Sequence, residues 1–115
     1  EKFIFLSAYS GMTTMCDKTI GEIFENKILK EKFIAAMKET QILAEKLNIE
    51  FKDDPIKFWL DKIENMPYKM TSSMHEDYKK KKKLEIQWLS GSIVKNCKKL
   101  NLDCKLHQEF VEKIS

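Results

Sequence analysis

The chain has 115 residues and a mass of 13.6 kDa, a size that suits one domain with a single hydrophobic core. Hydrophobic residues make up 43% and charged residues 34%, so enough apolar surface exists to offset the entropy cost of folding. Only 3 Gly and 2 Pro occur, and no glycine-rich phosphate loop is present. This composition excludes a many-stranded sandwich and a complete nucleotide-binding domain. The formal net charge of +3 is too weak by itself to indicate a nucleic-acid partner.

The cysteines are odd in number and lack a CxxC pair: Cys16, Cys97 and Cys104. His75 and His107 stand in no metal-ligand pattern. We therefore expect no disulfide framework, no metal, and reduced cysteines in a cytoplasmic protein. The longest apolar stretch, residues 3–8, is too short to span a bilayer, so no membrane partner is expected.

The first helix is predicted from residues 2 to 14. Apolar residues occupy nearly every side of it, and Gly11 allows a neighbour to approach closely. Because Glu1 is followed at once by this apolar element, we expect the chain to be a fragment of a longer protein. Thr19 then precedes a short helix that begins at Ile20.

The next helix, residues 29–47, is the most regular one in the sequence. Its apolar face has spacings of 4, 3, 4 and 3, which is the helical period: Phe33, Met37, Thr40, Ala44 and Leu47. Asn48 follows as a C-terminal stop. Asp54 and Pro55 are typical of an N-cap followed by the first helical residue, so another helix should run to Met66, before Pro67.

Three further helices complete an all-α fold. Ser73 and Glu76 form a capping-box pattern that predicts a helix start at Ser73. A long apolar stripe follows, ended by Asn101: Ile86, Leu89, Ile93, Cys97 and Leu100. Residues 106–114 form the last helix. One core is expected to include Phe3, Phe5, Phe33, Met37, Trp59, Leu89 and Ile93.

Single residues give only weak evidence for a catalytic function. Lys2, Ser73 and Glu85 have the side chains of a general acid, a hydrogen-bond donor and a carboxylate. Any helical protein of this composition supplies such residues, however. Ser73 is explained as an N-cap, and Glu85 as a first-turn carboxylate favoured by the helix dipole.

A block of residues in register nevertheless resembles the C-terminal domain of ketopantoate reductases: Ser72, Ser73, Met74, Asp77, Lys82, Glu85, Ile86 and Gly91. Lys2 and Phe3 are similar to the family's Trp-x-Lys segment, and residues 20–23 are similar to its Gly-Glu turn. Glu39 in the long helix also fits. The resemblance covers essentially the whole chain and implies a multi-helix domain like the C-terminal domain of 6-phosphogluconate dehydrogenase.

The resemblance implies an NADPH-dependent reduction of a 2-oxo acid to a 2-hydroxy acid, as in pantothenate biosynthesis. Residues 1–115 would be the C-terminal domain, inert alone, and a Rossmann domain that binds NADPH would precede Glu1. By the family pattern Lys2 is the general acid, Glu85 binds the distal hydroxyl of the substrate, and Ser73 hydrogen-bonds the substrate carboxylate. We expect these three residues to converge on one open surface. The oligomeric state is left open, a homodimer included.

Some positions depart from the family pattern. Leu6, Ile20 and Met70 replace asparagines that contact substrate, and Lys105 and His107 stand where the family has Pro-x-Asn. Because amide donors recognise a hydroxylated substrate, apolar replacements favour ketopantoate less than a related, less polar 2-oxo acid.

Two other classes of function are open on sequence alone. The lysine run 79–83 beside Tyr78 and Trp88 has the composition of a basic patch with aromatics for nucleic acid. A solvated lysine run explains it more simply, since no nucleic-acid-binding signature accompanies it. The 6 Met also allow a non-catalytic helical interaction or dimerisation module.

Overall fold

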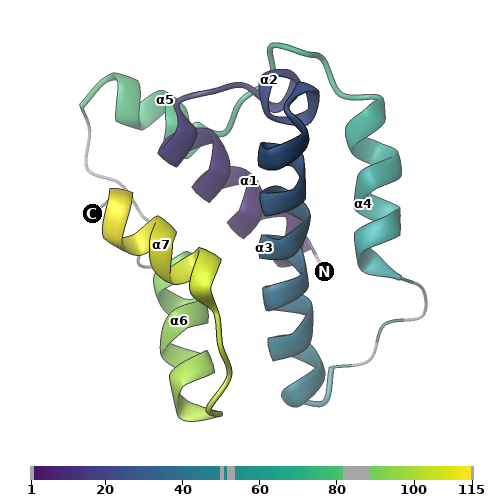
Figure 1. The fold of residues 1–115 in the computed structure, drawn as a ribbon, viewed down its shortest axis with the longest axis vertical. Coiled ribbons are helices and arrows are strands. Elements are labelled where there is room, and N and C mark those ends of the chain that lie inside the picture. Colours follow the sequence, from purple (N-terminus) through teal and green to yellow (C-terminus); the bar gives the residue numbers. More distant parts are fainter. Residues whose placement is uncertain (1, 50, 52–53, 82–88, 115) are drawn as a thin grey trace.

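A computed structural model describes residues 2–49, 51, 54–81 and 89–114, and these residues form helices and no strand. The expected all-α fold is confirmed (Figure 1). In chain order the helices are α1 (Lys2–Cys16), α2 (Ile20–Glu25), α3 (Lys27–Lys46), α4 (Pro55–Glu64), α5 (Ser73–Lys79), α6 (Ser90–Lys99) and α7 (Lys105–Ile114).

Most helix ends follow the local signals in the sequence. Thr19 caps α2 in a reciprocal capping box with Glu22, and the Asp54 carboxylate accepts hydrogen bonds from the first turn of α4. Asn48 and Asn101 adopt left-handed backbone conformations, with φ of 64° and 56°, just beyond α3 and α6. Asparagine tolerates this conformation better than most residues, which explains why both helices stop there.

The main core lies where α1 crosses behind α3 in the middle of the molecule (Figure 1). Phe5, Phe33 and Met37 are buried in it, as predicted. The ring of Phe5 stacks on Trp59 of α4 with 4.5 Å between centroids. Stacked aromatic rings bury large apolar areas, so this contact attaches α4 to the core.

Two parts of the predicted core are wrong. Phe3 is 39% exposed, because it lies at the open end of α1. Ile93 belongs to a second, smaller cluster with Leu43, Cys97 and Cys104, formed where α6 packs on the last turns of α3. Leu89 does pack against the main core, but it precedes α6 rather than lying within it, and Ile86 lies outside the described residues.

Phe110 of α7 packs directly on Gly11 of α1. A Cβ atom at position 11 would clash with the ring of Phe110, a side chain that is fully buried. The predicted close approach at Gly11 is therefore confirmed, and the absence of a side chain there lets Phe110 enter the main core.

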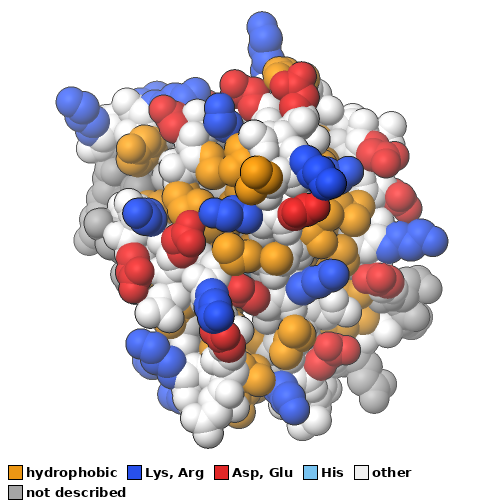
Figure 2. All heavy atoms as spheres, viewed as in Figure 1, with side chains coloured by type: hydrophobic (Ala, Val, Ile, Leu, Met, Phe, Trp, Pro, Cys, Tyr) orange, Lys and Arg blue, Asp and Glu red, His pale blue; other side chains and the backbone are white. Residues whose placement is uncertain are grey.

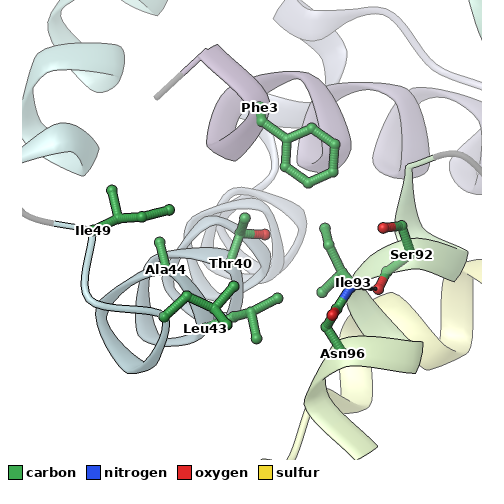
Figure 3. Close-up of a pocket in the computed structure, with 9 residues that line it drawn as sticks. Phe3, Thr40, Leu43, Ala44, Ile49, Ser92, Ile93 and Asn96 are labelled. Carbon is green, nitrogen blue, oxygen red and sulfur yellow. Dashed lines mark hydrogen bonds between the residues drawn. The ribbon is translucent and has the colours of Figure 1, made fainter. Parts of the chain in front are cut away.

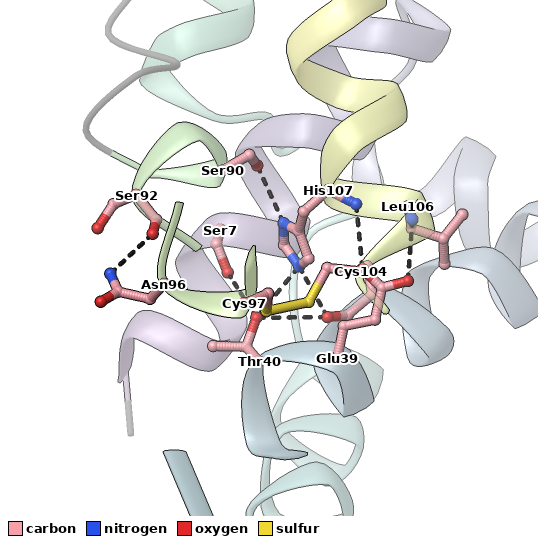
Figure 4. The surroundings of a disulfide bond; sticks show 11 residues. Ser7, Glu39, Thr40, Ser90, Ser92, Asn96, Cys97, Cys104, Leu106 and His107 are labelled. Carbon is pink, nitrogen blue, oxygen red and sulfur yellow. Dashed lines mark hydrogen bonds between the residues drawn. A yellow bond between two sulfur atoms is a disulfide. The ribbon is translucent and has the colours of Figure 1, made fainter. Parts of the chain in front are cut away.

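The prediction that the cysteines are reduced is wrong for two of them. Cys97 of α6 and Cys104, which directly precedes α7, form a disulfide (Figure 4). The turn at Asn101 reverses the chain and brings the two residues together, with their Cα atoms 6.5 Å apart. Sequence spacing alone does not show this reversal. Cys16 is a free, partly buried thiol whose pKa is raised chiefly by burial.

The surface carries charges of both signs. On the face shown in Figure 2, lysines alternate with acidic side chains, and apolar side chains lie between them in the middle of the face. This face therefore presents no extended basic patch of the kind that nucleic-acid binding requires. Within the described residues, no helix combines the length and apolar character needed to cross a membrane.

Candidate functional site

The start of α5 carries Ser72 and Ser73, the centre of the sequence block described above. Ser72, not Ser73, is the N-cap: its Oγ accepts a hydrogen bond from the backbone N–H of His75 at 3.1 Å. The predicted capping box is therefore wrong by one residue, because the helix begins at Ser73 and Ser72 has the extended backbone of a cap. Ser73 is exposed, so its hydroxyl is free of the capping role first assigned to it.

A buried hydroxyl pair joins α5 to the end of α1. Thr13 Oγ1 and Ser72 Oγ lie 2.6 Å apart, and Thr13 also donates to the carbonyl oxygen of Tyr9. Lys2 lies at the opposite end of the same helix, roughly 16 Å along the axis at 1.5 Å per residue. Ser73 and the backbone of Lys2 are thus fixed relative to each other by a single rigid helix.

The structure does not test whether the three predicted site residues lie together. Ser73 is placed, the side chain of Lys2 lies outside what the structure describes, and Glu85 falls in the segment 82–88, also outside it. Convergence of Lys2, Ser73 and Glu85 on one surface therefore stays a prediction.

Leu6, Ile20 and Met70, which replace asparagines of the family pattern, differ in how exposed they are to solvent. The backbone N–H of Ile20 donates to the carbonyl of Met70 at 2.9 Å, so these two positions are neighbours. Ile20 is 2% exposed and belongs to the core, whereas Met70 is 41% exposed. Leu6 is partly buried against the main core. Of the three, Met70 presents the largest open apolar surface.

Segment 67–72, which contains Met70 and leads into α5, is hydrogen-bonded to α2. Gly21 N–H donates to the Tyr68 carbonyl at 3.0 Å, and the Tyr68 hydroxyl donates to Glu25 at 2.6 Å. That hydrogen bond to a carboxylate raises the pKa of Tyr68 to about 12. The backbone on either side of Met70 is therefore held in place before α5 begins.

Sequence reasoning assigned no role to the pair Asp17 and His75. The His75 ring is buried, and its Nε2 lies 2.6 Å from Oδ1 of Asp17. This hydrogen bond holds the pKa of Asp17 below its usual value. The only signal in the sequence is the position of His75, two residues after Ser73 in the matched block.

His107 lies at the centre of a second buried polar network (Figure 4). Nε2 donates to the Ala36 carbonyl at 2.8 Å, and Nδ1 lies 3.0 Å from Ser90 Oγ. Burial lowers the pKa of His107 to about 4, so the ring is neutral at pH 7 and Nδ1 accepts from Ser90. Glu39 accepts the backbone N–H groups of Leu106 and His107, which caps α7 from a distant helix.

This second network is structural in character. Its polar groups satisfy one another and hold α3, α6 and α7 together. In the described part of the chain, no group of three or more His, Cys, Asp or Glu side chains is arranged to hold a metal ion.

A pocket of about 220 Å³ opens between the first turn of α1, the end of α3 and α6 (Figure 3). Its lining is mostly apolar and includes Phe3, Leu43 and Ile93. Asn96 lies at its edge and donates to the Ser92 carbonyl at 2.8 Å. Phe3 is exposed because it forms one wall of this pocket.

Comparison with known proteins identifies the family. A family model described as "Ketopantoate reductase PanE/ApbA C terminal" matches residues 1–115. The chain belongs to this family. The predicted resemblance to this family is thereby confirmed.

Individual relatives agree with this assignment. The 2-dehydropantoate 2-reductase of Archaeoglobus fulgidus is 24% identical over 110 residues, which cover 96% of this chain and 36% of that protein. Among solved structures, the dimeric ketopantoate reductase from Staphylococcus aureus has a TM-score of 0.90 at 17% identity, covering 98% of this chain and 39% of that one.

A ketopantoate reductase of the PanE/ApbA family from Ralstonia eutropha has a TM-score of 0.84 at 19% identity, covering 95% of this chain and 36% of that one. At these identities the solved structures show a shared fold. The chain spans little more than a third of the length of these relatives.

Proposed function

We propose that this chain is the C-terminal, substrate-binding domain of an NADPH-dependent reductase that converts a 2-oxo acid to its 2-hydroxy acid. The observation that supports this most strongly is the family match over residues 1–115. Lys2, Ser73 and Glu85 are assigned to the site because the sequence around them resembles the family motif. The substrate is ketopantoate or a related, less polar 2-oxo acid. The protein is proposed to be cytoplasmic and to pair as a homodimer.

An N-terminal Rossmann domain of the same protein is proposed to bind the cofactor. The described residues form helices and the sequence has no glycine-rich loop, so these residues do not fit the phosphates of NADPH. Bound NADPH supplies the hydride in the family reaction. The helical domain is therefore proposed to bind and orient the 2-oxo acid.

Lys2 is proposed to donate the proton to the carbonyl oxygen of the substrate. A nearby ammonium stabilises the negative charge that develops on this oxygen, and partial desolvation would lower the pKa of a lysine toward neutrality. Ser73 is proposed to hydrogen-bond the substrate carboxylate with its exposed hydroxyl. Glu85 is proposed to accept a hydrogen bond from a distal hydroxyl of the substrate, when one is present.

A steady-state assay of the full-length protein with NADPH and a panel of 2-oxo acids tests this function. Lys2→Ala should lower kcat by roughly 10²–10⁴-fold, the usual contribution of a positioned acid, and should leave NADPH affinity unchanged. Lys113→Ala, an exposed lysine in the last turn of α7, serves as the control. Wild-type protein that reduces no 2-oxo acid, or a Lys2→Ala enzyme with full activity, would contradict the proposal.

A further inference from the structure

The pair Asp17 and His75 connects the end of α1 to the first turn of α5. The His75 side chain is 1% exposed, whereas that of Asp17 is 64% exposed. Their 2.6 Å contact therefore runs from the interior to the surface. Burying a polar ring is costly unless its nitrogens find partners, so this contact has to be maintained in the folded protein.

The other nitrogen of the His75 ring is also occupied. Nδ1 lies 2.6 Å from Thr71 Oγ1, so a ring that donates from Nε2 to Asp17 accepts at Nδ1 from the Thr71 hydroxyl. Ser72 Oγ accepts from the His75 backbone and pairs with Thr13. Ser73 is thus held from both sides, by the cap at Ser72 and by the ring of His75.

Asp17 is itself rigidly placed. It follows the last residue of α1 with a left-handed backbone, φ 54°, and its N–H donates to the Thr14 carbonyl at 3.3 Å. The next N–H, from Lys18, donates to the Thr13 carbonyl at 3.1 Å. The turn that presents the Asp17 carboxylate is therefore anchored to α1, the helix that begins at Lys2.

We propose that Asp17 and His75 are positioning residues for Ser73: together they fix the first turn of α5 against α1, so that the Ser73 hydroxyl meets the carboxylate of the 2-oxo acid substrate. This inference rests on the proposed function, because it assigns the pair a role through a substrate-binding serine. Neither residue contacts the substrate. Packing alone would be served equally well by an apolar side chain at position 75, which would need no partner at Asp17.

Steady-state kinetics of the full-length reductase, with NADPH and its best 2-oxo acid, test the pair. Asp17→Asn is the mildest variant, because asparagine also tolerates the left-handed conformation but cannot carry the charge. His75→Leu fills the same space and breaks both ring contacts, whereas His75→Gln keeps an amide that can reach Asp17. We expect His75→Leu to raise KM about tenfold, the scale of one lost hydrogen bond, and Asp17→Asn to raise it about threefold.

The expected pattern separates positioning from general stability. The kcat of both variants should stay within about twofold of wild type, since the proton donor is untouched, and His75→Gln should restore KM most of the way. In a Ser73→Ala background, Asp17→Asn should have no further effect on KM, because the pair acts through Ser73. Asp103→Asn, which removes the carboxylate of an exposed ion pair with Lys105, is the matched control and should change nothing.

The outcomes distinguish this inference from the proposed function. If Ser73→Ala raises KM but Asp17→Asn and His75→Leu do not, the positioning role is wrong and the function stands. Should His75→Leu fail to fold, Asp17→Asn at the surface decides the question alone. A Ser73→Ala variant with unchanged KM overturns the inference and the role of Ser73 but leaves the reductase function standing, whereas an enzyme that reduces no 2-oxo acid overturns both.

Discussion

Several buried polar side chains determine local details of this domain, because a buried polar group is costly unless it finds a partner inside the protein. His107 is fully buried and neutral, and its two nitrogens bind groups on α3 and on the first residue of α6. A protonated ring could not accept from Ser90 and would place a charge in the core. The folded state therefore resists protonation of His107.

This resistance makes stability depend on pH. In the unfolded chain His107 takes up a proton near pH 6.5, whereas in the folded protein its pKa is about 4. The unfolded state thus binds more protons between these values, and the free energy of unfolding should fall by roughly 3 kcal/mol as the pH drops from 6.5 to 4. Denaturant titrations at several pH values measure this change.

A His107→Gln variant is the reference for that titration, because it lacks the titrating ring. Glu39 has a raised pKa, chiefly through burial, so its contribution has the opposite sign: protonation of Glu39 favours the folded state as the pH falls. The contribution of His107 is the difference between wild type and His107→Gln in how the free energy of unfolding changes with pH. If the free energy of unfolding changes equally with pH in the two proteins, His107 is not buried in its neutral form.

The two serines at the start of α5 give a second prediction. Ser72→Ala removes the N-cap and leaves Thr13 without its hydroxyl partner, so it should lower the free energy of unfolding by about 1–2 kcal/mol. Ser73→Ala is the matched control on an exposed position and should change stability by less than about 0.5 kcal/mol. Thermal or denaturant unfolding of both variants measures the difference. If Ser73→Ala lowers the free energy of unfolding more than Ser72→Ala does, then Ser73 is the N-cap.

Contacts between residues close together in the chain can be predicted from the sequence, whereas contacts between distant residues cannot. Thr19 and Asp54 cap helices through groups two or three residues away, so their roles are predictable from spacing. Glu39 caps α7 across 67 positions of the chain, and His75 reaches Asp17 across 58. No periodic pattern encodes such contacts, which is why the Asp17 and His75 pair was found only in the structure.

At the scale of whole helices, α6 and α7 behave as one unit. Their disulfide closes a short loop around the turn at Asn101, and Cys97 and Cys104 also belong to the small apolar cluster with Ile93. The last helix was predicted from residue 106 and is observed from Lys105, and Asn101 was correctly predicted to stop α6. The start of α6 at Ser90 was not predicted, because the apolar stripe begins earlier, at Ile86. Their covalent connection was missed, because it depends on how the turn folds back.

Loss of this disulfide should weaken the α6 and α7 unit. A closed loop of this length restricts the unfolded chain by an amount worth about 2 kcal/mol, so Cys97→Ser combined with Cys104→Ser should lower the free energy of unfolding by that amount. Thermal unfolding with and without a reductant measures it. Cys16→Ser, which removes the free thiol, is the control and should keep the sensitivity to reductant. Equal stability of wild type in both conditions would contradict the disulfide.

At the scale of the molecule, the helices form a domain whose family was predictable from a few residues in register rather than from composition. Ser72, Ser73 and Met74 mark that register, and the family match over the whole chain agrees with it. The face shown in Figure 2 gives no comparable signal, because its charges are mixed in sign. The expected convergence of Lys2 and Glu85 stays a prediction, because these residues lie far apart in the chain and no helical period relates them.

The last prediction concerns which domain binds NADPH. If the cofactor is held by a separate Rossmann domain, the isolated 115-residue chain should bind NADPH weakly or not at all, because none of its described helices follows a glycine-rich phosphate loop. Calorimetry at physiological salt measures this, with circular dichroism to show that the chain is helical and the full-length protein as the positive control. Micromolar binding of NADPH to the isolated chain would place cofactor contacts in this domain and would contradict the proposed arrangement.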